Sequence, residues 1–345
     1  MQHDRRSLGE EMSMSAEIKD AEPVKKGTWN RRRVLKVVGG AAAFGAAGAV
    51  GVVAYDQLYP ALAGEPLLTV PDHRVQVPKS TPQLVIARGT DPAKNVLAAL
   101  ARVGGMAAFV GASDTVLVKP NVGWDRTPIQ AANTNPAVIE AVVRACKEAG
   151  AREVIVTDGS VHDPGRSFKR SGIQEAALRA GARVVLPDAL AYVDVSIPGL
   201  PGRWPVLEPF AKATKIINVP IAKHHGSATV TAGMKNWIGI TRQRRSMFHA
   251  RLDHTIASLA AMMKPTLTIV DATRVLLRNG PRGGNLDDVK VENAVAVALD
   301  PVAVDAWATE LLGKRTSQVA YLAMAEQLGL GKIDYKSLNP VELTT

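Results

Sequence analysis

Histidine and lysine side chains are concentrated in one short stretch of the chain. Lys223, His224 and His225 stand together, and Lys235 and Asn236 follow soon after. Imidazole is the commonest protein ligand for metals and the usual general acid or base near neutral pH, and a lysine amine can act as a nucleophile. Any one histidine can equally be a hydrogen-bonded structural residue, but the cluster favours a functional site.

Other histidines extend this group. His249 and His254 follow it in sequence, and His162 stands in a separate polar segment. The spacing matches neither the zinc proteases nor the zinc fingers. We therefore treat the histidines as candidates for proton transfer or metal binding, without a named metal.

Polar side chains also follow four segments that are predicted to be buried strands, 115–118, 153–157, 215–219 and 267–270. These side chains are Lys119, Asn121, Asp158, Ser160, His162, Lys223, His224, His225 and Asp271. Parallel strands send their carboxyl ends to one edge of a sheet, and such sheets bind ligands there. We therefore expect one site at this edge, with Lys119, Asp158, His225, Lys235 and His249 acting together.

Two loops are suited to holding an anion. Residues 119–134 form a long connection that ends at a predicted helix N-terminus, where backbone N–H groups attract negative charge. Residues 279–284 form a glycine-rich turn in which Arg282 and the amide of Gly283 could hold a carboxylate or phosphate. The alternatives are a solvated loop with an ordinary helix cap and a purely structural turn.

Strands and helices alternate from residue 83 to the C-terminus. A strand at 115–118, a helix from Asn135 to Ala149 and a strand at 153–157 form a β-α-β unit, which implies a parallel strand pair. The sequence therefore predicts an α/β fold with a mostly parallel sheet flanked by helices. We expect this domain to span residues 83–345, as a single body or as two lobes.

Composition and charge narrow the choice of partners. The formal net charge is +10, so we expect a small anionic molecule as a partner. Aromatic residues make up 4% of the chain and are not interleaved with a basic cluster, which argues against nucleic acid. Cys146 is the single cysteine, which excludes an intramolecular disulfide and an iron–sulfur cluster with cysteine ligands. Its place on a helical apolar stripe predicts a buried side chain.

The first 63 residues are typical of a twin-arginine export signal. Arg31 and Arg32 precede an uncharged apolar run at 37–54, and small residues at 60–63 offer a cleavage site. We expect residues 64–82 to be a linker and the protein to be exported, to the periplasm or another extracytoplasmic place, by the twin-arginine translocation machinery. The alternative is that residues 37–54 stay uncut and anchor the protein, as its one contact with a membrane.

Several motifs together resemble the family of the domain of unknown function 362. They are Val118–Asn121, Thr134–Pro136, Glu148–Ala151 with Val154–Val156, Ile217–Pro220, Lys223–His224, Gly233–Asn236, Asn279–Pro281, Gly283–Gly284 and Asp300–Ala306. The resemblance covers nearly the whole chain after the signal. The family has no settled activity. Many of its members carry ferredoxin-like iron–sulfur modules, which this chain cannot form with one cysteine.

A more distant resemblance is to lactate racemase and its relatives, which use a nickel pincer nucleotide. Gly159–His162 is similar to their Gly-x-His element with one extra residue, and Gly233–Lys235 is similar to their Gly-x-Lys element. The resemblance implies that His162 and His225 are the acid/base pair, that Lys235 carries the cofactor and that His249 is the nickel ligand. His224 is a second candidate ligand.

The leading expectation is therefore an exported enzyme of small-molecule chemistry with a bound metal or cofactor. Its chemistry would be racemase-like, on a 2-hydroxy acid. The rival is a non-catalytic protein that binds a small anion through Lys119, Arg282 and helix N-termini.

Overall fold

A ten-stranded sheet forms the centre of the protein, in a computed structural model that describes residues 67–241 and 251–345. Its main path runs in the order β12 (Val341–Thr344), β1 (Leu84–Arg88), β11 (Val289–Ala298), β10 (Leu267–Leu276), β7 (Lys215–Val219), β2 (Thr115–Pro120), β3 (Glu153–Val156) and β4 (Arg183–Val184). Off this path, β8 (Ile221–His225) pairs with β10 and with β9 (Thr229–Thr231). A separate two-stranded sheet joins β5 (Tyr192–Ile197) to β6 (Leu200–Leu207).

The sheet is mostly parallel, as the alternation of strands and helices predicts. From β10 through β7, β2 and β3 to β4, each neighbouring pair is parallel. Only β11, which lies between β1 and β10, and the small β8–β9 hairpin introduce antiparallel pairs into this sheet of the described residues. The carboxyl ends of β2, β3 and β7 consequently lie at one edge.

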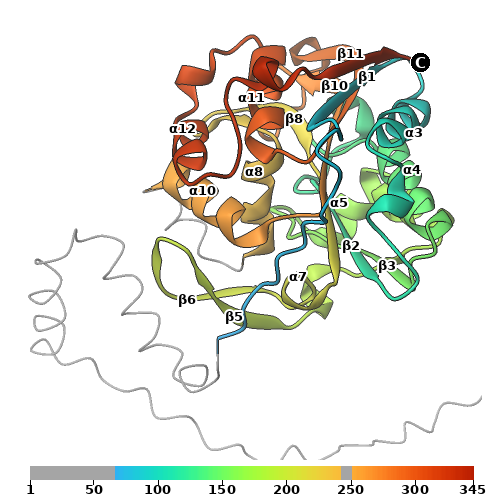
Figure 1. The fold of residues 1–345 in the computed structure, drawn as a ribbon, viewed down its shortest axis with the longest axis vertical. Coiled ribbons are helices and arrows are strands. Elements are labelled where there is room, and N and C mark those ends of the chain that lie inside the picture. The colour runs from blue at the N-terminus through green and yellow to red at the C-terminus, as the bar shows by residue number, and fades with distance from the viewer. Residues whose placement is uncertain (1–66, 242–250) are drawn as a thin grey trace, which may run out of the picture.

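Helices cover both faces of the sheet (Figure 1). One face is covered by α3 (Pro92–Arg102), α4 (Pro136–Glu148), α5 (Pro164–Arg170) and α6 (Ile173–Arg179). The other face is covered by α7 (Pro209–Lys212), α8 (Gly233–Asn236), α10 (Leu252–Met263), α11 (Pro301–Leu311) and α12 (Ala320–Gln327). Alternate strand residues point to opposite faces, so Leu84 and Ile86 join one core while Val85 and Ala87 join the other. The predicted α/β sandwich of helix, sheet and helix is confirmed.

Two strands differ from the sequence prediction in a way that matters for the site. Pro220 ends β7, because proline has no backbone N–H for the ladder, yet the chain pairs again at once as β8. Lys223, His224 and His225 are therefore inside a strand and do not form a loop after β7. Similarly, β10 continues past the predicted end at residue 270, so Asp271 lies within it.

Other expectations concern the chain before the sheet and the cysteine. The predicted linker packs against the domain at His73, whose backbone N–H donates to the Lys264 carbonyl and whose carbonyl accepts from the Thr266 hydroxyl. Cys146 is buried on α4 as predicted, and burial raises the pKa of its thiol to about 12. None of the helices described at 67–241 and 251–345 is long and apolar enough to cross a bilayer. The signal at 1–63 lies outside the described residues.

Candidate functional site

A pocket of about 350 Å³ lies where the polar strand ends meet. The predicted site residues that line it are Asn121, Asp158, Lys223, His225, Lys235 and Asn236. They come from the ends of β2 and β3, from β8 and from the short helix α8, which are well separated in sequence. The topology thus brings together side chains that the sequence only placed near strand ends.

A fully buried ion pair supports one side of this pocket. Lys119 Nζ lies 2.6 Å from Asp158 Oδ1, and the two side chains are 0% and 3% exposed. Asp158 Oδ2 also accepts the Val122 backbone N–H at 2.9 Å. A Cβ at Gly239 would overlap Asp158 Oδ1, so the chain can pass this close to the pair only because residue 239 is glycine. Burial of both charges is tolerable because each is paired and hydrogen-bonded.

Lys223 is the second buried cation, and its surroundings are different. Its side chain is 1% exposed, and its amine donates to the Asn121 side-chain oxygen at 2.9 Å and to the Ala132 carbonyl. Both acceptors are neutral. Burial above all, and then the charges of Lys235 and Lys119, lower the pKa of Lys223 to about 7 against the opposing charge of Asp158.

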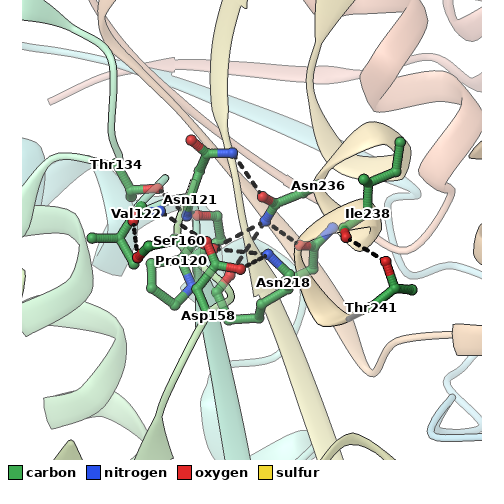
Figure 2. Close-up of polar contacts among 12 residues, drawn as sticks. Pro120, Asn121, Val122, Thr134, Asp158, Ser160, Asn218, Asn236, Ile238 and Thr241 are labelled. Carbon is green, nitrogen blue, oxygen red and sulfur yellow. Dashed lines mark hydrogen bonds and ion pairs between the residues drawn. The ribbon is translucent and has the colours of Figure 1, made fainter. Parts of the chain in front are cut away.

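A chain of side-chain amides continues from Lys223 into the interior, and its members Asn121, Asn236 and Asn218 are drawn in Figure 2. The Asn121 amide nitrogen donates to Asn236 Oδ1 at 2.9 Å, and the Asn236 nitrogen donates to Asn218 Oδ1 at 2.9 Å. The Asn218 nitrogen then donates to the Gly233 carbonyl at 2.8 Å. Each bond fixes the flip of the next amide, because a reversed amide would face oxygen with oxygen or nitrogen with nitrogen. The floor of the pocket is therefore preorganised.

The amide chain ends at the Gly233 carbonyl, and the N–H of the same residue donates to Asp305, a buried carboxylate on α11. The backbone N–H groups of Gly233 and Met234 donate to its two oxygens at 2.6 and 3.0 Å, and the Tyr321 hydroxyl donates at 3.3 Å. Burial raises the pKa of Asp305 to about 7, although these three donors act in the opposite direction. A Cβ at Gly233 would lie 2.9 Å from Asp305 Oδ1, so glycine permits this contact. Asp305 thus positions α8, the helix that carries Lys235 and Asn236.

Sequence reasoning did not single out Asn218 or Asp305 as site residues. Both were quoted only as parts of larger motifs, although the signal was present. Asn218 lies between apolar residues of a strand, and Asp305 lies between apolar residues of a helix. A polar residue at a core position needs a hydrogen-bonding partner, and this requirement points to a network.

His225 and Lys235 both line the pocket. His225 is 8% exposed, and its Nδ1 accepts the backbone N–H groups of Ser227 and Ala228 at 3.1 and 3.2 Å. An accepting Nδ1 assigns the proton of the neutral imidazole to Nε2. The turn between β8 and β9 therefore fixes the tautomer of His225.

Ser160 and His162 were expected in the site, but neither is among the residues that line the pocket. The Ser160 hydroxyl donates to the Val122 carbonyl at 2.7 Å, as Figure 2 shows. His162 Nδ1 accepts the Asp125 backbone N–H at 3.3 Å, and the His162 ring meets Trp124 edge to face at 4.9 Å. These two side chains tie the loop after β3 to the loop after β2.

Asp271 also differs from the expectation, because its carboxylate binds protein groups. It accepts the Asn135 backbone N–H at 2.7 Å at the start of α4, and the Thr273 N–H and hydroxyl at 2.9 and 2.7 Å. Burial raises the pKa of Asp271. The helix N-terminus that was expected to attract an anion thus already faces one from the protein itself.

The remaining predicted residues lie apart from the pocket or outside the description. Arg282 is exposed, and Gly283 adopts a left-handed turn against Leu276, in agreement with the structural alternative for this segment. His224 Nδ1 accepts the Gly280 N–H at 3.1 Å, and burial followed by the charge of Lys314 lowers its pKa. His249 lies outside the described residues.

The described residues do not fit a metal centre. None of the His, Cys, Asp and Glu side chains at 67–241 and 251–345 gathers in a group of three or more that could hold a metal ion. Asp158, the one carboxylate among the described lining residues, is already committed to Lys119 and to the Val122 N–H. His249, the expected nickel ligand, lies outside the described residues, and Lys235, the expected cofactor lysine, lines the pocket, so nickel and a nickel pincer nucleotide stay predictions.

The chain is similar to several known proteins. Over 246 residues it is 25% identical to the thylakoid-associated protein sll1697 of Synechocystis sp., a match that covers 66% of this chain and 72% of the relative. It is similar to the lactate racemase apoprotein of Thermoanaerobacterium thermosaccharolyticum (TM-score 0.40, 14% identity, 67% of this chain and 58% of that one). It is also similar to a protein from Thermotoga maritima (TM-score 0.41, 15% identity, 66% and 60%).

The chain spans less than two thirds of the length of either of these two solved structures. The family model of the domain of unknown function DUF362 matches residues 116–310, which include the strand ends, the amide chain and Asp305. The expected resemblance is thereby confirmed, and the chain belongs to the DUF362 family.

Proposed function

We propose that the protein is an enzyme of small-molecule chemistry that binds a small anion in this pocket. The observation that carries the proposal is Lys223, a buried amine whose two hydrogen-bond acceptors, Asn121 and Ala132, are neutral. Lys235 and Lys119 add positive charge that acts on it, against the single opposing charge of Asp158. A bound anion would stabilise the protonated amine, because opposite charges attract strongly where water is excluded.

Proton transfer is the chemistry that these groups support best. A general acid or base works most effectively when its pKa lies near the working pH, and the pKa of Lys223 is lowered to about 7. His225 lines the same pocket with its proton assigned to Nε2. We therefore assign proton transfer to Lys223 and His225. This pair replaces the expected pair of His162 and His225, because His162 holds a loop.

Hydrogen exchange tests this proposal. Small carboxylic acids, including 2-hydroxy acids, are incubated with the protein in D2O, and loss of the proton next to the carboxylate is followed by NMR. We expect exchange with at least one acid, and its loss in Lys223→Met. Lys147→Met, which removes an exposed lysine of α4, is the matched control. Anion binding without exchange would support the rival, a non-catalytic binding protein; absence of both would refute the pocket assignment.

We also propose export by the twin-arginine machinery. The support is the sequence of residues 30–63, which lies outside the described residues. Replacement of Arg31 and Arg32 by Lys should retain an uncut precursor in the cytoplasm, because the receptor reads that arginine pair. Arg33→Lys is the matched control and should be exported. Cell fractionation measures the export. Normal export of the double variant would refute the assignment of a twin-arginine signal.

A further inference from the structure

The lining of the pocket has an apolar part that the proposed chemistry does not use. Trp124, Val161, Ile238 and Leu252 line it together with the lysines and amides. Val161 is 52% exposed although it is apolar. An aromatic and aliphatic wall beside a cationic one is typical of a site for a ligand with two unlike ends, because apolar surface gains free energy when a ligand removes it from water.

Trp124 is held in place by hydrogen bonds to its backbone N–H and carbonyl and by one contact to its ring. Its backbone N–H donates to Asn133 Oδ1 at 3.0 Å, and the Asn133 amide donates back to its carbonyl at 2.7 Å. The Val161 and His162 N–H groups both donate to the Gly123 carbonyl, at 2.9 and 3.0 Å. The His162 ring then packs edge to face against Trp124. A fixed aromatic side chain loses little conformational entropy when a ligand binds.

The pocket is larger than a three-carbon acid. At about 350 Å³ it falls within the range of roughly 300–1,000 Å³ that drug-sized ligands occupy. A ligand that placed only a carboxylate against the lysines would leave the Trp124 side of this volume to water.

The head group of the ligand follows from the backbone donors. Phosphates are usually held by the N–H groups of helix N-termini. Here the first N–H groups of α8 donate to Asp305, and Asn135 at the start of α4 donates to Asp271. The polar side chains left in the lining are two amines, two amides, the His225 imidazole and the hydroxyls of Ser227 and Thr231, a set of donors that can hold a carboxylate.

We propose that the anion is an aromatic carboxylate, with its ring against Trp124 and Val161 and its carboxylate at Lys223 and Lys235. The inference rests on the proposed function and adds the ligand class to it. Aromatic pairs prefer offset-stacked or edge-to-face geometry and gain more than area burial alone provides. Trp124 is therefore a specificity-determining residue.

Calorimetric titration with four probes tests the inference. The probes are propionate, 3-phenylpropionate, 3-cyclohexylpropionate and phenyl phosphate. We expect 3-phenylpropionate to bind at least about tenfold more tightly than propionate, and more tightly than the cyclohexyl compound, which has a similar size without aromaticity. Trp124→Ala should remove this advantage, and a circular dichroism spectrum and thermal unfolding transition like those of the wild type show that the variant is folded. Ile129→Ala, on the same loop but outside the lining, is the matched control.

Each result decides a separate point. Equal affinity for propionate and 3-phenylpropionate would overturn the inference and leave the proposed function standing. Equal affinity for the phenyl and cyclohexyl compounds would overturn the aromatic assignment, and tighter binding of phenyl phosphate would overturn the carboxylate. Binding of none of the four probes would count against the proposed function itself.

Discussion

Replacement of Lys223 by Met should change how the stability of the protein depends on pH. The folded protein lowers the pKa of this amine from 10.5 to about 7, chiefly by burial. Between these two values the unfolded chain carries the proton and the folded chain does not. Stability rises with pH wherever the unfolded state binds more protons. The wild-type protein should therefore gain stability from about pH 7 upwards. Well below pH 7 both states carry the proton, so the full cost of burying the charged amine is present and does not change with pH.

The size of the effect follows from the shift. One pKa unit corresponds to about 1.4 kcal/mol, so the full shift is worth roughly 5 kcal/mol across the whole window. From pH 7 to about pH 9 the gain should be about 2 kcal/mol, because the amine is still half protonated at the start of this interval. Lys223→Met lacks this gain. It also leaves the oxygens of Asn121 and Ala132 without their donor, at a cost of about 1–3 kcal/mol each that does not depend on pH.

Urea unfolding at a series of pH values measures directly how the free energy of unfolding changes with pH. The free energy of unfolding of the wild type, minus that of Lys223→Met, should rise by about 2 kcal/mol from pH 7 to about pH 9. Lys147→Met removes an exposed lysine on α4 and should run parallel to the wild type. A constant difference between wild type and Lys223→Met would refute the reasoning, because it would mean that Lys223 keeps its ordinary pKa in the folded protein.

Three further substitutions test the supports of the site. Asp158→Asn leaves the buried Lys119 without its counter-charge and should lower the free energy of unfolding by about 3–5 kcal/mol in urea titrations. Gly239→Ala places a methyl group on Asp158 Oδ1 and should lower the thermal unfolding midpoint. Gly123→Ala is the control and should leave the midpoint nearly unchanged, because a Cβ there makes only an ordinary van der Waals contact. Asp305→Asn removes one acceptor from the α8 backbone N–H groups and should lower the free energy of unfolding in urea by about 1–3 kcal/mol. An unchanged free energy of unfolding would show that α8 does not depend on Asp305.

Much of the fold could be predicted because it follows from local patterns. The strand at Lys215–Val219 has the predicted bounds, and α4 begins and ends within a residue of its predicted limits, since Asn135 and Pro136 are strong start signals. The β8–β9 hairpin was not predicted. Its pairing depends on β10, a strand some fifty residues further along the chain, which no local pattern reveals.

The expected site residues stay predictions, but the structure shows which of them lie together. Lys119 and Asp158 meet because parallel strands share an edge, whereas Lys223 reaches the pocket from inside β8. The same rule could not tell residues that line a pocket from residues that hold the loops around it. Ser160 and His162 are not in the pocket lining, and each bonds a backbone group of the loop after β2. Those contacts depend on how two loops pack together.

Calorimetry of propionate binding at a pH slightly above 7, in two buffers that differ in ionisation enthalpy, tests the central claim most directly. If an anion binds beside Lys223, it raises the pKa of the amine, and the protein must take up a proton as it binds. We predict a binding enthalpy that depends on the buffer and reports an uptake of up to about one proton. In Lys223→Met we predict weaker binding without uptake. Buffer-independent binding, or binding that Lys223→Met leaves unchanged, would contradict the account.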